Sequence, residues 1–297
     1  MTFNHNKNKL KVLLAGTPNF SVLTFSKIID NFDVVGLIAQ PNRPIGRNLI
    51  VTEPPTVMMA KNAKKVKIFQ PEKVANIYDE LRKLDFDVLL TMAYGQIIPE
   101  NILKLAKKGS YNIHGSLLPK YRGASPIQYA LLNGDKETGI TFMEMNSKMD
   151  AGDIVFQETL KIEKDDTFDS LLKKMSSLSA SNIVSWLNNI QNNSFNKTKQ
   201  NESEVTYAPK ISKEDEKILF DTMDNTINKI RSLSSSPGAY LILNSNQEGF
   251  KFIQNQRMKV FRATKKFVKN APEIKCKDGV IYALEYQFEG RRKVIVN

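Results

Sequence analysis

Short apolar runs alternate with stretches of helical spacing through the first two thirds of the chain. The run Lys11–Ala15 leads through a Gly-Thr-Pro turn into a helical pattern over Phe20–Ile29, and Asp33–Gln40 is a second apolar run. Short, continuously apolar runs are typical of strands buried on both faces of a parallel sheet. A strand, a helix and a second strand in this order predict the opening of a doubly wound α/β sheet.

The same alternation continues to residue 190, and we place a first domain at residues 1–190. The last pattern, Thr167–Ile190, has apolar residues at helical spacing and should cover the sheet. The other expected helices are Val57–Lys64, Val74–Leu84, Asn101–Lys107 and Pro126–Leu132. The other expected strands are Val66–Phe69, Asp87–Ala93, Ser110–Ile113, and the hairpin Thr138–Met145 with Ile154–Ile162.

A polar stretch separates this part from the last third of the chain. Residues 191–204 are nearly devoid of apolar side chains, so we interpret 191–209 as a linker between domains. Beyond it, Phe220–Leu233 has a helical pattern and is followed by short β segments. Such segments predict a small β-barrel over residues 210–297. These segments are Phe250–Ile253, Met258–Ala263, Val280–Tyr286 and Lys293–Val296.

One connection is unusually long. Pro41–Pro55 holds five prolines and glycines among its fifteen residues, and it carries Arg43 and Arg47. Most such loops are solvated connections. Long loops in compact domains are, however, disproportionately functional, so this loop is a candidate binding element.

Composition narrows the class of protein. The 297 residues are 41% hydrophobic and 25% charged, as in globular proteins, with room for a sizeable core. No apolar run reaches the length of a membrane span, and the polar start lacks the apolar core of a secretory signal. The single cysteine, Cys276, excludes an intramolecular disulfide and fits a reducing cytoplasm. We therefore expect a cytoplasmic protein, a monomer, with no zinc site.

Charge points to a polyanionic partner. The net charge is +12, and the last third, Thr206–Asn297, holds 17 lysines and arginines against 10 aspartates and glutamates. A basic domain of this kind favours nucleic-acid binding. A proteome generally rich in lysine would give the same balance, so composition alone leaves both explanations open.

The candidate chemistry lies at the end of one expected strand. Asn112 and His114 are two residues apart, so they project from the same face before Gly115 and Pro119 end the strand. Ligands bind at the carboxyl edge of open α/β sheets. An amide can donate to a developing oxyanion, and an imidazole can move a proton, which suits acyl-group chemistry. A purely structural histidine is the alternative. No G-x-G-x-x-G follows the first strand, so nothing favours a dinucleotide.

Two segments carry a family resemblance. The stretch Asn112–Gln128, here called the signature segment, is similar to the signature loop of the folate-dependent formyltransferases. Met149-Asp150-Ala-Gly-Asp153-Ile154 resembles their second active-site segment. Within that superfamily the chain, from Val12 to about Arg292, most resembles the methionyl-tRNA formyltransferases. The resemblance implies a Rossmann-like formyltransferase domain followed by a barrel of the OB-like kind.

The resemblance also implies site residues. Asn112, His114 and Asp150 are then catalytic, with Asp150 holding or charging the imidazole. A pterin pocket for 10-formyltetrahydrofolate is implied with no metal, and contacts to tRNA are implied in the Gln40–Arg47 loop and the second domain. The implied folate-binding residues are Ser116, Leu117, Leu118, Pro119, Tyr94, Gly95, Gln96 and Ile97. The implied tRNA-binding residues are Arg43, Arg47, Lys265 and Lys266.

The implied function is transfer of the formyl group of 10-formyltetrahydrofolate to the amine of methionyl initiator tRNA. The Tyr207-Ala-Pro-Lys segment resembles the family's interdomain segment and favours this acceptor, as does the Pro41–Pro55 loop. After Arg47, however, the chain continues Asn48-Leu-Ile-Val where the family carries further basic residues. Two alternatives remain: formylation of an amino sugar or nucleotide, and a non-catalytic nucleic-acid-binding protein.

Overall fold

The computed structural model describes residues 9–46, 49–63, 66–243 and 256–296. Contacts divide these residues into two compact units. The first comprises the chain up to Arg122 together with 139–159 and 173–205, and the second comprises 123–138, 160–172 and 206 onward. The units therefore interleave along the chain, and the expected domain boundaries stay a prediction.

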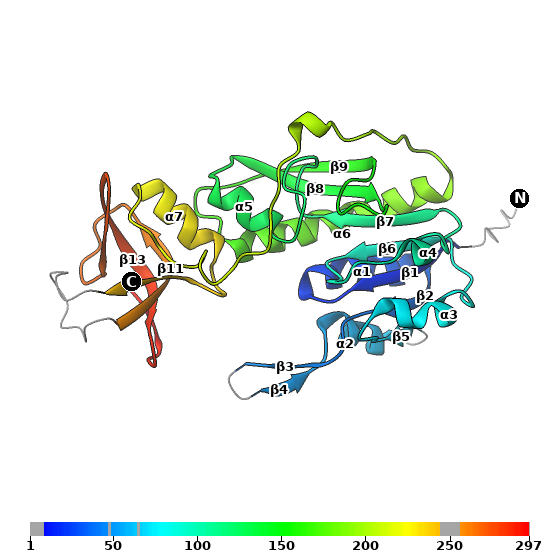
Figure 1. The fold of residues 1–297 in the computed structure, drawn as a ribbon, viewed down its shortest axis with the longest axis horizontal. Coiled ribbons are helices and arrows are strands. Elements are labelled where there is room, and N and C mark those ends of the chain that lie inside the picture. Colours follow the sequence, from blue (N-terminus) through cyan, green and yellow to red (C-terminus); the bar gives the residue numbers. More distant parts are fainter. Residues whose placement is uncertain (1–8, 47–48, 64–65, 244–255, 297) are drawn as a thin grey trace, which may run out of the picture. The chain divides into compact units, whose positions relative to one another are not determined.

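A seven-stranded sheet is the centre of the first unit (Figure 1). Its order is β5-β2-β1-β6-β7-β8-β9, and the pairs from β5 through β7 are parallel, whereas β7 and β8 are antiparallel. The chain starts in the middle and moves first to one edge and then to the other, as in a doubly wound fold. The strands are β1 (Lys11–Gly16), β2 (Asp33–Ile38), β5 (Lys67–Phe69), β6 (Val88–Met92), β7 (Gly109–His114), β8 (Glu137–Glu144) and β9 (Ile154–Lys161).

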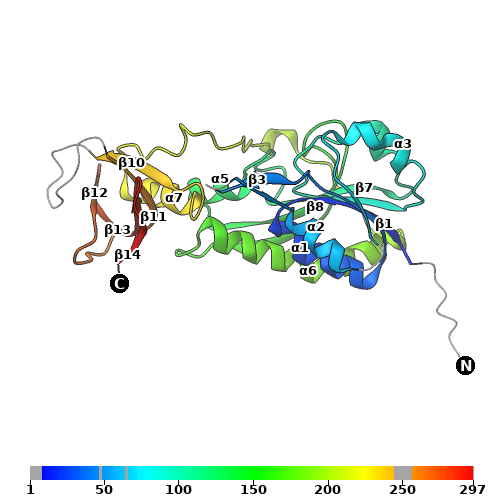
Figure 2. The ribbon, with the colours of Figure 1, turned by 90° about the horizontal axis from the view of Figure 1, so that it is seen from below.

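Helices cover both faces of this sheet. Figures 1 and 2 show α1 (Asn19–Asn31) beside α6 (Phe168–Gln191) on one face and α3 (Tyr78–Leu81) on the other. The Thr24 and Ser179 hydroxyls bond each other at 3.0 Å across the two helices. The apolar runs of β1 and β6 are buried throughout because both faces are covered. The expected α/β class is confirmed.

Several expected elements differ in length. The helix expected over Val74–Leu84 is a 3₁₀ turn (Val74–Ile77) followed by the short α3, because only Val74 and Leu81 of this stretch are fully buried. The helix expected at 101–107 is likewise reduced to α4 (Glu100–Leu103), whereas α2 (Pro55–Asn62) and α5 (Pro126–Leu132) lie where their patterns predict.

The Pro41–Pro55 connection contains a β-hairpin, which the sequence pattern did not predict. β3 (Arg43–Ile45) pairs antiparallel with β4 (Ile50–Thr52), and Arg43 lies opposite Thr52. The hairpin projects from the body of the first unit (Figure 1). All three residues of β4 are exposed, so no alternation of buried and exposed positions marks the strand in the sequence.

The second unit contains an antiparallel sheet, and α7 (Met223–Ser232) contributes Ile230 to its apolar core. The order is β10-β11-β13-β12, with β14 also paired to β13. Irregular register between β11 and β13 curls the sheet, so the expected small barrel-like domain is confirmed in its curled antiparallel form. The strands are β10 (Ala239–Leu243), β11 (Gln256–Thr264), β12 (Glu273–Cys276), β13 (Gly279–Phe288) and β14 (Lys293–Ile295).

The strands β10 and β12 were not predicted from the sequence. Both are short, at five and four residues, and β12 alternates exposed and buried positions in a stretch broken by charged residues. The strand expected at Phe250–Ile253 lies outside the described residues. In this unit α7 is shorter than the helix expected over Phe220–Leu233. Thr222 caps its N-terminus, because the Thr222 side chain accepts a hydrogen bond from the backbone N–H of Asn225.

Candidate active site

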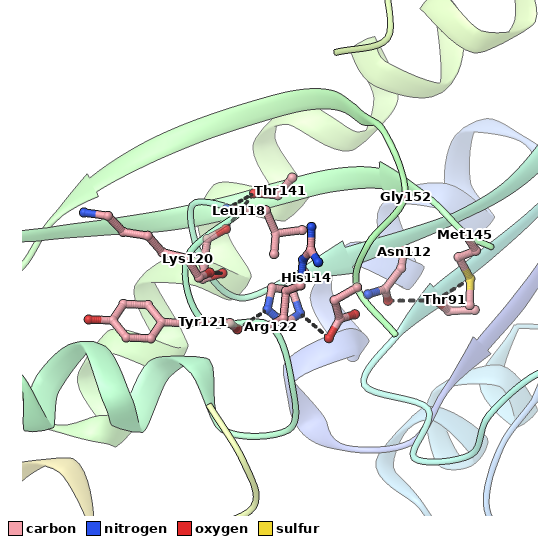
Figure 3. A network of polar contacts seen from close by, with 12 residues as sticks. Thr91, Asn112, His114, Leu118, Lys120, Tyr121, Arg122, Thr141, Met145 and Gly152 are labelled. Carbon is pink, nitrogen blue, oxygen red and sulfur yellow. Dashed lines mark hydrogen bonds and ion pairs between the residues drawn. The ribbon is translucent and has the colours of Figure 1, made fainter. Parts of the chain in front are cut away.

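The end of β7 brings together side chains from three strands. Thr91 of β6 is in register with Asn112, and Thr141 of β8 is in register with His114. Asn112 and His114 share one face of β7 because they are two residues apart. Figure 3 shows these residues together with Arg122 and Gly152 around the strand end. β7 thus delivers an amide and an imidazole to one edge of the sheet, and β6 and β8 place a threonine beside each of them.

His114 is held at both ring nitrogens. Its Nε2 lies 2.8 Å from the carbonyl oxygen of Tyr121, and since a carbonyl only accepts, Nε2 donates. Its Nδ1 faces the Asp150 carboxylate, with 3.6 Å to Oδ2. The side chains are 6% and 14% exposed, so water screens this contact little. A hydrogen on Nδ1 makes the contact with the carboxylate attractive, whereas a lone pair there makes it repulsive.

The Asn112 amide is oriented by a hydroxyl. Thr91 Oγ1 donates to Asn112 Oδ1 over 2.7 Å, and Thr91 is 3% exposed (Figure 3). With its oxygen taken, the amide presents its nitrogen, a donor of two hydrogens. The Met145 sulfur lies 3.3 Å from the same hydroxyl and helps enclose it. The arrangement therefore offers a fixed N–H donor next to a histidine, as an oxyanion site requires.

Asp150 reaches the site from the loop between β8 and β9, residues 146–153, here called the Asp150 loop. Its backbone is left-handed, with φ of 51°. Gly152 packs so closely on the neighbouring strand that a Cβ there would lie 1.8 Å from the Glu144 carbonyl oxygen. The composition Asp-Ala-Gly-Asp would also suit a simple turn between two strands. The contact between Asp150 and His114 distinguishes this loop from such a turn.

The implied folate residues of the signature segment are fixed to β8. Thr141 Oγ1 donates to the Ser116 carbonyl at 2.6 Å and accepts from the Leu118 amide at 3.1 Å. Ser116 and Leu118 are buried, whereas Leu117 and Pro119 are partly exposed. The Ser116 hydroxyl donates to the Lys120 carbonyl over 2.6 Å, so its side chain stabilises the turn. The backbone conformation of this segment is thus strongly fixed.

The second implied folate segment, Tyr94–Ile97, leaves the carboxyl end of β6. Gly95 has φ of 89°, and a Cβ there would lie 3.5 Å from Gln40 Nε2; Ile97 is 79% exposed. Gln96 is turned inward: its Oε1 accepts from the Val74 amide at 2.8 Å. The buried Tyr94 hydroxyl finds no partner among the described residues, and burial raises its pKa to about 12. Both implied folate segments therefore leave the same sheet edge, from neighbouring strands.

Comparison with known proteins decides the family. The profile of the "Formyl transferase" family matches residues 8–187, and that of "Formyl transferase, C-terminal domain" matches residues 210–297. A methionyl-tRNA formyltransferase of Mycoplasmopsis pulmonis is 45% identical over 290 residues, which are 97% of this chain and 96% of that protein. One of Mycoplasma capricolum is 42% identical over 300 residues, 98% and 94% of the two chains. The chain belongs to the methionyl-tRNA formyltransferase family.

Solved structures share the fold. HypX from Aquifex aeolicus, in complex with tetrahydrofolic acid, has a TM-score of 0.65 at 15% identity and covers 97% of this chain, which covers 46% of HypX. The N-formyltransferase from Helicobacter canadensis, in complex with folinic acid and dTDP-3-aminofucose, has a TM-score of 0.65 at 20% identity and covers 92% of this chain, which covers 99% of it. At these identities the likeness is one of fold.

The implied tRNA-binding residues of this family member lie on exposed elements. Arg43 begins the β3–β4 hairpin, is 57% exposed in its side chain and pairs with Glu72. Arg47 lies outside the described residues. Lys265 pairs with Asp224 at 2.7 Å, and the backbone amide of Lys266 donates to Thr264 Oγ1 at 3.2 Å. These residues are not part of the catalytic cluster, and their contact with tRNA stays a prediction.

The residues that hold the site were not predicted from the sequence. Thr91 and Thr141 look like ordinary strand threonines until the strand register sets them beside Asn112 and His114. Gln200 lies in the polar stretch interpreted as a linker, yet its side chain bonds the Asp150 loop. The sequence offered one signal for these residues, which is that Thr91 is a polar residue near the end of the otherwise apolar strand β6.

No group of three or more histidines, cysteines, aspartates and glutamates among the described residues could hold a metal ion. None of the helices in the described part of the chain combines the length and apolarity that crossing a membrane requires.

Proposed function

We propose that this chain transfers the formyl group of 10-formyltetrahydrofolate to the free amine of methionyl initiator tRNA. The observation that carries the proposal is the convergence of Asn112, His114 and Asp150 at one strand end in a chain of the methionyl-tRNA formyltransferase family.

The roles of the three residues follow from their contacts. When an amine attacks a formyl carbon, the formyl oxygen becomes negative and needs hydrogen-bond donors. Asn112 Nδ2 supplies a donor because Thr91 holds the amide oxygen on the other side. A donor fixed before reaction needs no reorganisation when charge develops, which makes such sites effective. Asn112 is therefore the proposed oxyanion donor.

His114 and Asp150 are the proposed proton-handling pair. The Nε2 hydrogen is committed to the Tyr121 carbonyl, so the Nδ1 side is the one from which a proton can move. Asp150 Oδ2 lies 3.6 Å from that nitrogen and stabilises a positive imidazole. An unprotonated Nδ1 takes the proton that the attacking amine loses, and the resulting imidazolium can hydrogen-bond the developing oxyanion. As the bond between the formyl carbon and the donor nitrogen breaks, Nδ1 gives this proton to the departing nitrogen.

The formyl donor suits the two turns at this edge. When bound, it supplies an activated formyl group on nitrogen. The exposed backbone at Gly95 and the exposed Ile97 offer hydrogen-bonding groups and apolar surface to a flat heterocycle. The signature segment supplies Ser116–Pro119, whose backbone is fixed by Thr141. We propose that these segments hold the donor mostly through backbone groups.

We propose that the exposed basic residues bind the acceptor, the charged tRNA. Arg43 on the hairpin and, by its place in the sequence, Arg47 would bind the acceptor end of the tRNA, and Lys265 and Lys266 would bind its phosphates. The sugar-phosphate backbone supplies most of the affinity in such complexes through its charge. We further propose a catalytic domain at 1–190, a linker at 191–209 and a tRNA-binding domain at 210–297, in a cytoplasmic monomer.

The deciding experiment incubates the purified chain with formyl donor and methionine-charged initiator tRNA, and then analyses the aminoacyl ester for formyl-methionine. The same incubation with a nucleotide-linked amino sugar measures the rival acceptor. Formylation of the charged tRNA, with the sugar turned over at least about a hundredfold more slowly, is the expected result. A faster reaction with the sugar, or no reaction with any amine, would contradict the proposal.

A further inference from the structure

One side chain outside the proposed catalytic residues bridges the two loops that hold them. Gln200 Nε2 donates to the Asp150 carbonyl at 2.8 Å and to the Gly152 carbonyl at 2.7 Å. Its Oε1 accepts from Arg122 Nε at 3.0 Å. Both hydrogens and the oxygen of one primary amide are thus used, and the bridge joins the Asp150 loop to the signature segment.

The Asp150 loop needs such an anchor. A left-handed backbone is less favourable for residues with a Cβ than for glycine, and Asp150 adopts it with φ of 51°. The two ends of the loop are held by backbone bonds: the Glu144 amide donates to the Asp153 carbonyl at 2.9 Å, and Ile154 and Thr198 bond each other at 2.8 Å. Gln200 bonds the carbonyls of Asp150 and Gly152. It therefore fixes the direction in which the Asp150 side chain leaves the backbone.

The other end of the bridge leads back to His114. Arg122 is 5% exposed and makes two contacts with Glu202, at 2.9 Å and 3.3 Å, besides its bond to Gln200. It follows Tyr121, whose carbonyl accepts from His114 Nε2. The Gln200 amide thus connects Arg122, whose neighbour Tyr121 holds His114 Nε2, to the Asp150 loop that faces His114 Nδ1.

We propose that Gln200 is a positioning residue, which sets the Asp150 carboxylate against His114 and makes the polar segment 198–204 a part of the active site. The inference rests on the proposed function, because it acts through Asp150. In this view the stretch interpreted as a linker carries a catalytic requirement, because its Gln200 side chain bonds the Asp150 loop and the signature segment at once.

Two Gln200 variants and one control test the proposal. Gln200→Ala removes all three hydrogen bonds, and Gln200→Glu keeps an oxygen for Arg122 but loses both donors to the carbonyls. Lys197→Ala is the control, since Lys197 directly precedes this segment and pairs with Glu144 of β8 at 2.7 Å. We expect both Gln200 variants to lower kcat by about tenfold to a hundredfold, the scale of a small misplacement of catalytic groups, with KM for tRNA within about twofold. The control should keep kcat within about twofold of the unsubstituted chain.

A double-mutant cycle separates positioning from general damage. In an Asp150→Asn background, Gln200→Ala should reduce kcat by less than about twofold further, because the group it positions is already gone. A full additional loss in that background would overturn the proposal. So would a Gln200→Ala variant with kcat equal to that of the Lys197→Ala control.

Hydrogen exchange distinguishes this inference from the proposed function. The Ile154 amide, which donates to Thr198, should exchange about tenfold faster in Gln200→Ala than in the unsubstituted chain or in Lys197→Ala. If the unsubstituted chain formylates no charged tRNA, the proposed function is wrong, and exchange alone decides whether Gln200 holds the loop. Unchanged exchange at Ile154 and at its neighbours in the Asp150 loop would overturn the positioning role.

Discussion

The strand end at β7 and the β3–β4 hairpin carry the two halves of the proposed reaction, and they are built differently. At the strand end, His114 and Asp150 are 6% and 14% exposed, and each polar group has a defined partner. On the hairpin, Arg43 is 57% exposed, and Leu49, Ile50 and Val51 are all at least 64% exposed. Chemistry needs fixed donors in a poorly hydrated place, whereas a large acceptor needs surface. The difference predicts that substitutions at the first region change kcat and that substitutions at the second change acceptor use.

The largest effect should come from His114. Replacing it with Ala should lower kcat by about 10²–10⁴, the scale of general acid–base catalysis. Removing the partner of the Tyr121 carbonyl should cost on the order of 1–3 kcal/mol of unfolding free energy, so the variant should still fold. Single-turnover formylation and thermal melting measure the two quantities. His5→Ala, at the only other histidine, is the control. A near-normal kcat in His114→Ala would show that β7 does not end in the catalytic centre.

The second largest effect on kcat should come from Asn112. Asn112→Ala should lower kcat by about 10²–10³, as expected when an oxyanion donor is removed. Thr91→Val removes the hydroxyl that orients this amide at nearly constant volume and should lower kcat by about tenfold, with Thr91→Ser restoring it. Steady-state kinetics with saturating donor measure these effects. Equal activity of the Val and Ser variants would mean that Thr91 serves packing alone.

A smaller, acceptor-specific effect is expected at Arg43. Arg43→Ala should raise KM for charged tRNA by about tenfold, equivalent to about 1.4 kcal/mol of binding free energy, while turnover of a small free amine and donor binding stay unchanged. Arg82→Ala is a matched control, because Arg82 is 56% exposed and pairs with Asp79 much as Arg43 pairs with Glu72. An equal decrease with both acceptors would make the hairpin a structural element and remove its support for tRNA recognition.

The smallest effect is expected in the second unit. Replacing Lys265 and Lys266 with Ala should reduce the slope of log affinity against log salt by about 0.7–0.9 for each phosphate that the variant no longer neutralises. Because Lys265 pairs with Asp224, part of its charge is already compensated. We therefore expect the decrease in slope due to Lys265 to lie near about 0.7. Filter binding of tRNA at several salt concentrations gives the slope. Lys104→Ala, at an exposed lysine of the first unit, should leave it unchanged.

The sequence determined the fold class and the catalytic candidates. Apolar runs of strand length between helical patterns predict a doubly wound sheet because each run has to be buried on both faces. The spacing of Asn112 and His114 fixes their shared face, since side chains alternate along a strand. The resemblance added Asp150, which the spacing of the sequence could not connect to His114. The hairpin was missed because all three residues of β4 are exposed, and β10 and β12 were missed because five and four residues make too short a pattern.

Only the tertiary structure decided what holds these residues in place. Thr91 meets Asn112 through the register of two strands, across 21 residues of sequence. Gln200 meets Asp150 across 50 residues, from a stretch whose composition predicts a linker. Hydrogen bonds of this kind depend on where the backbone of each partner finally lies, and the hydrophobic pattern that fixes the sheet says nothing about that position. The sequence by itself thus determined which groups can do the chemistry, and tertiary packing decided their partners and orientation.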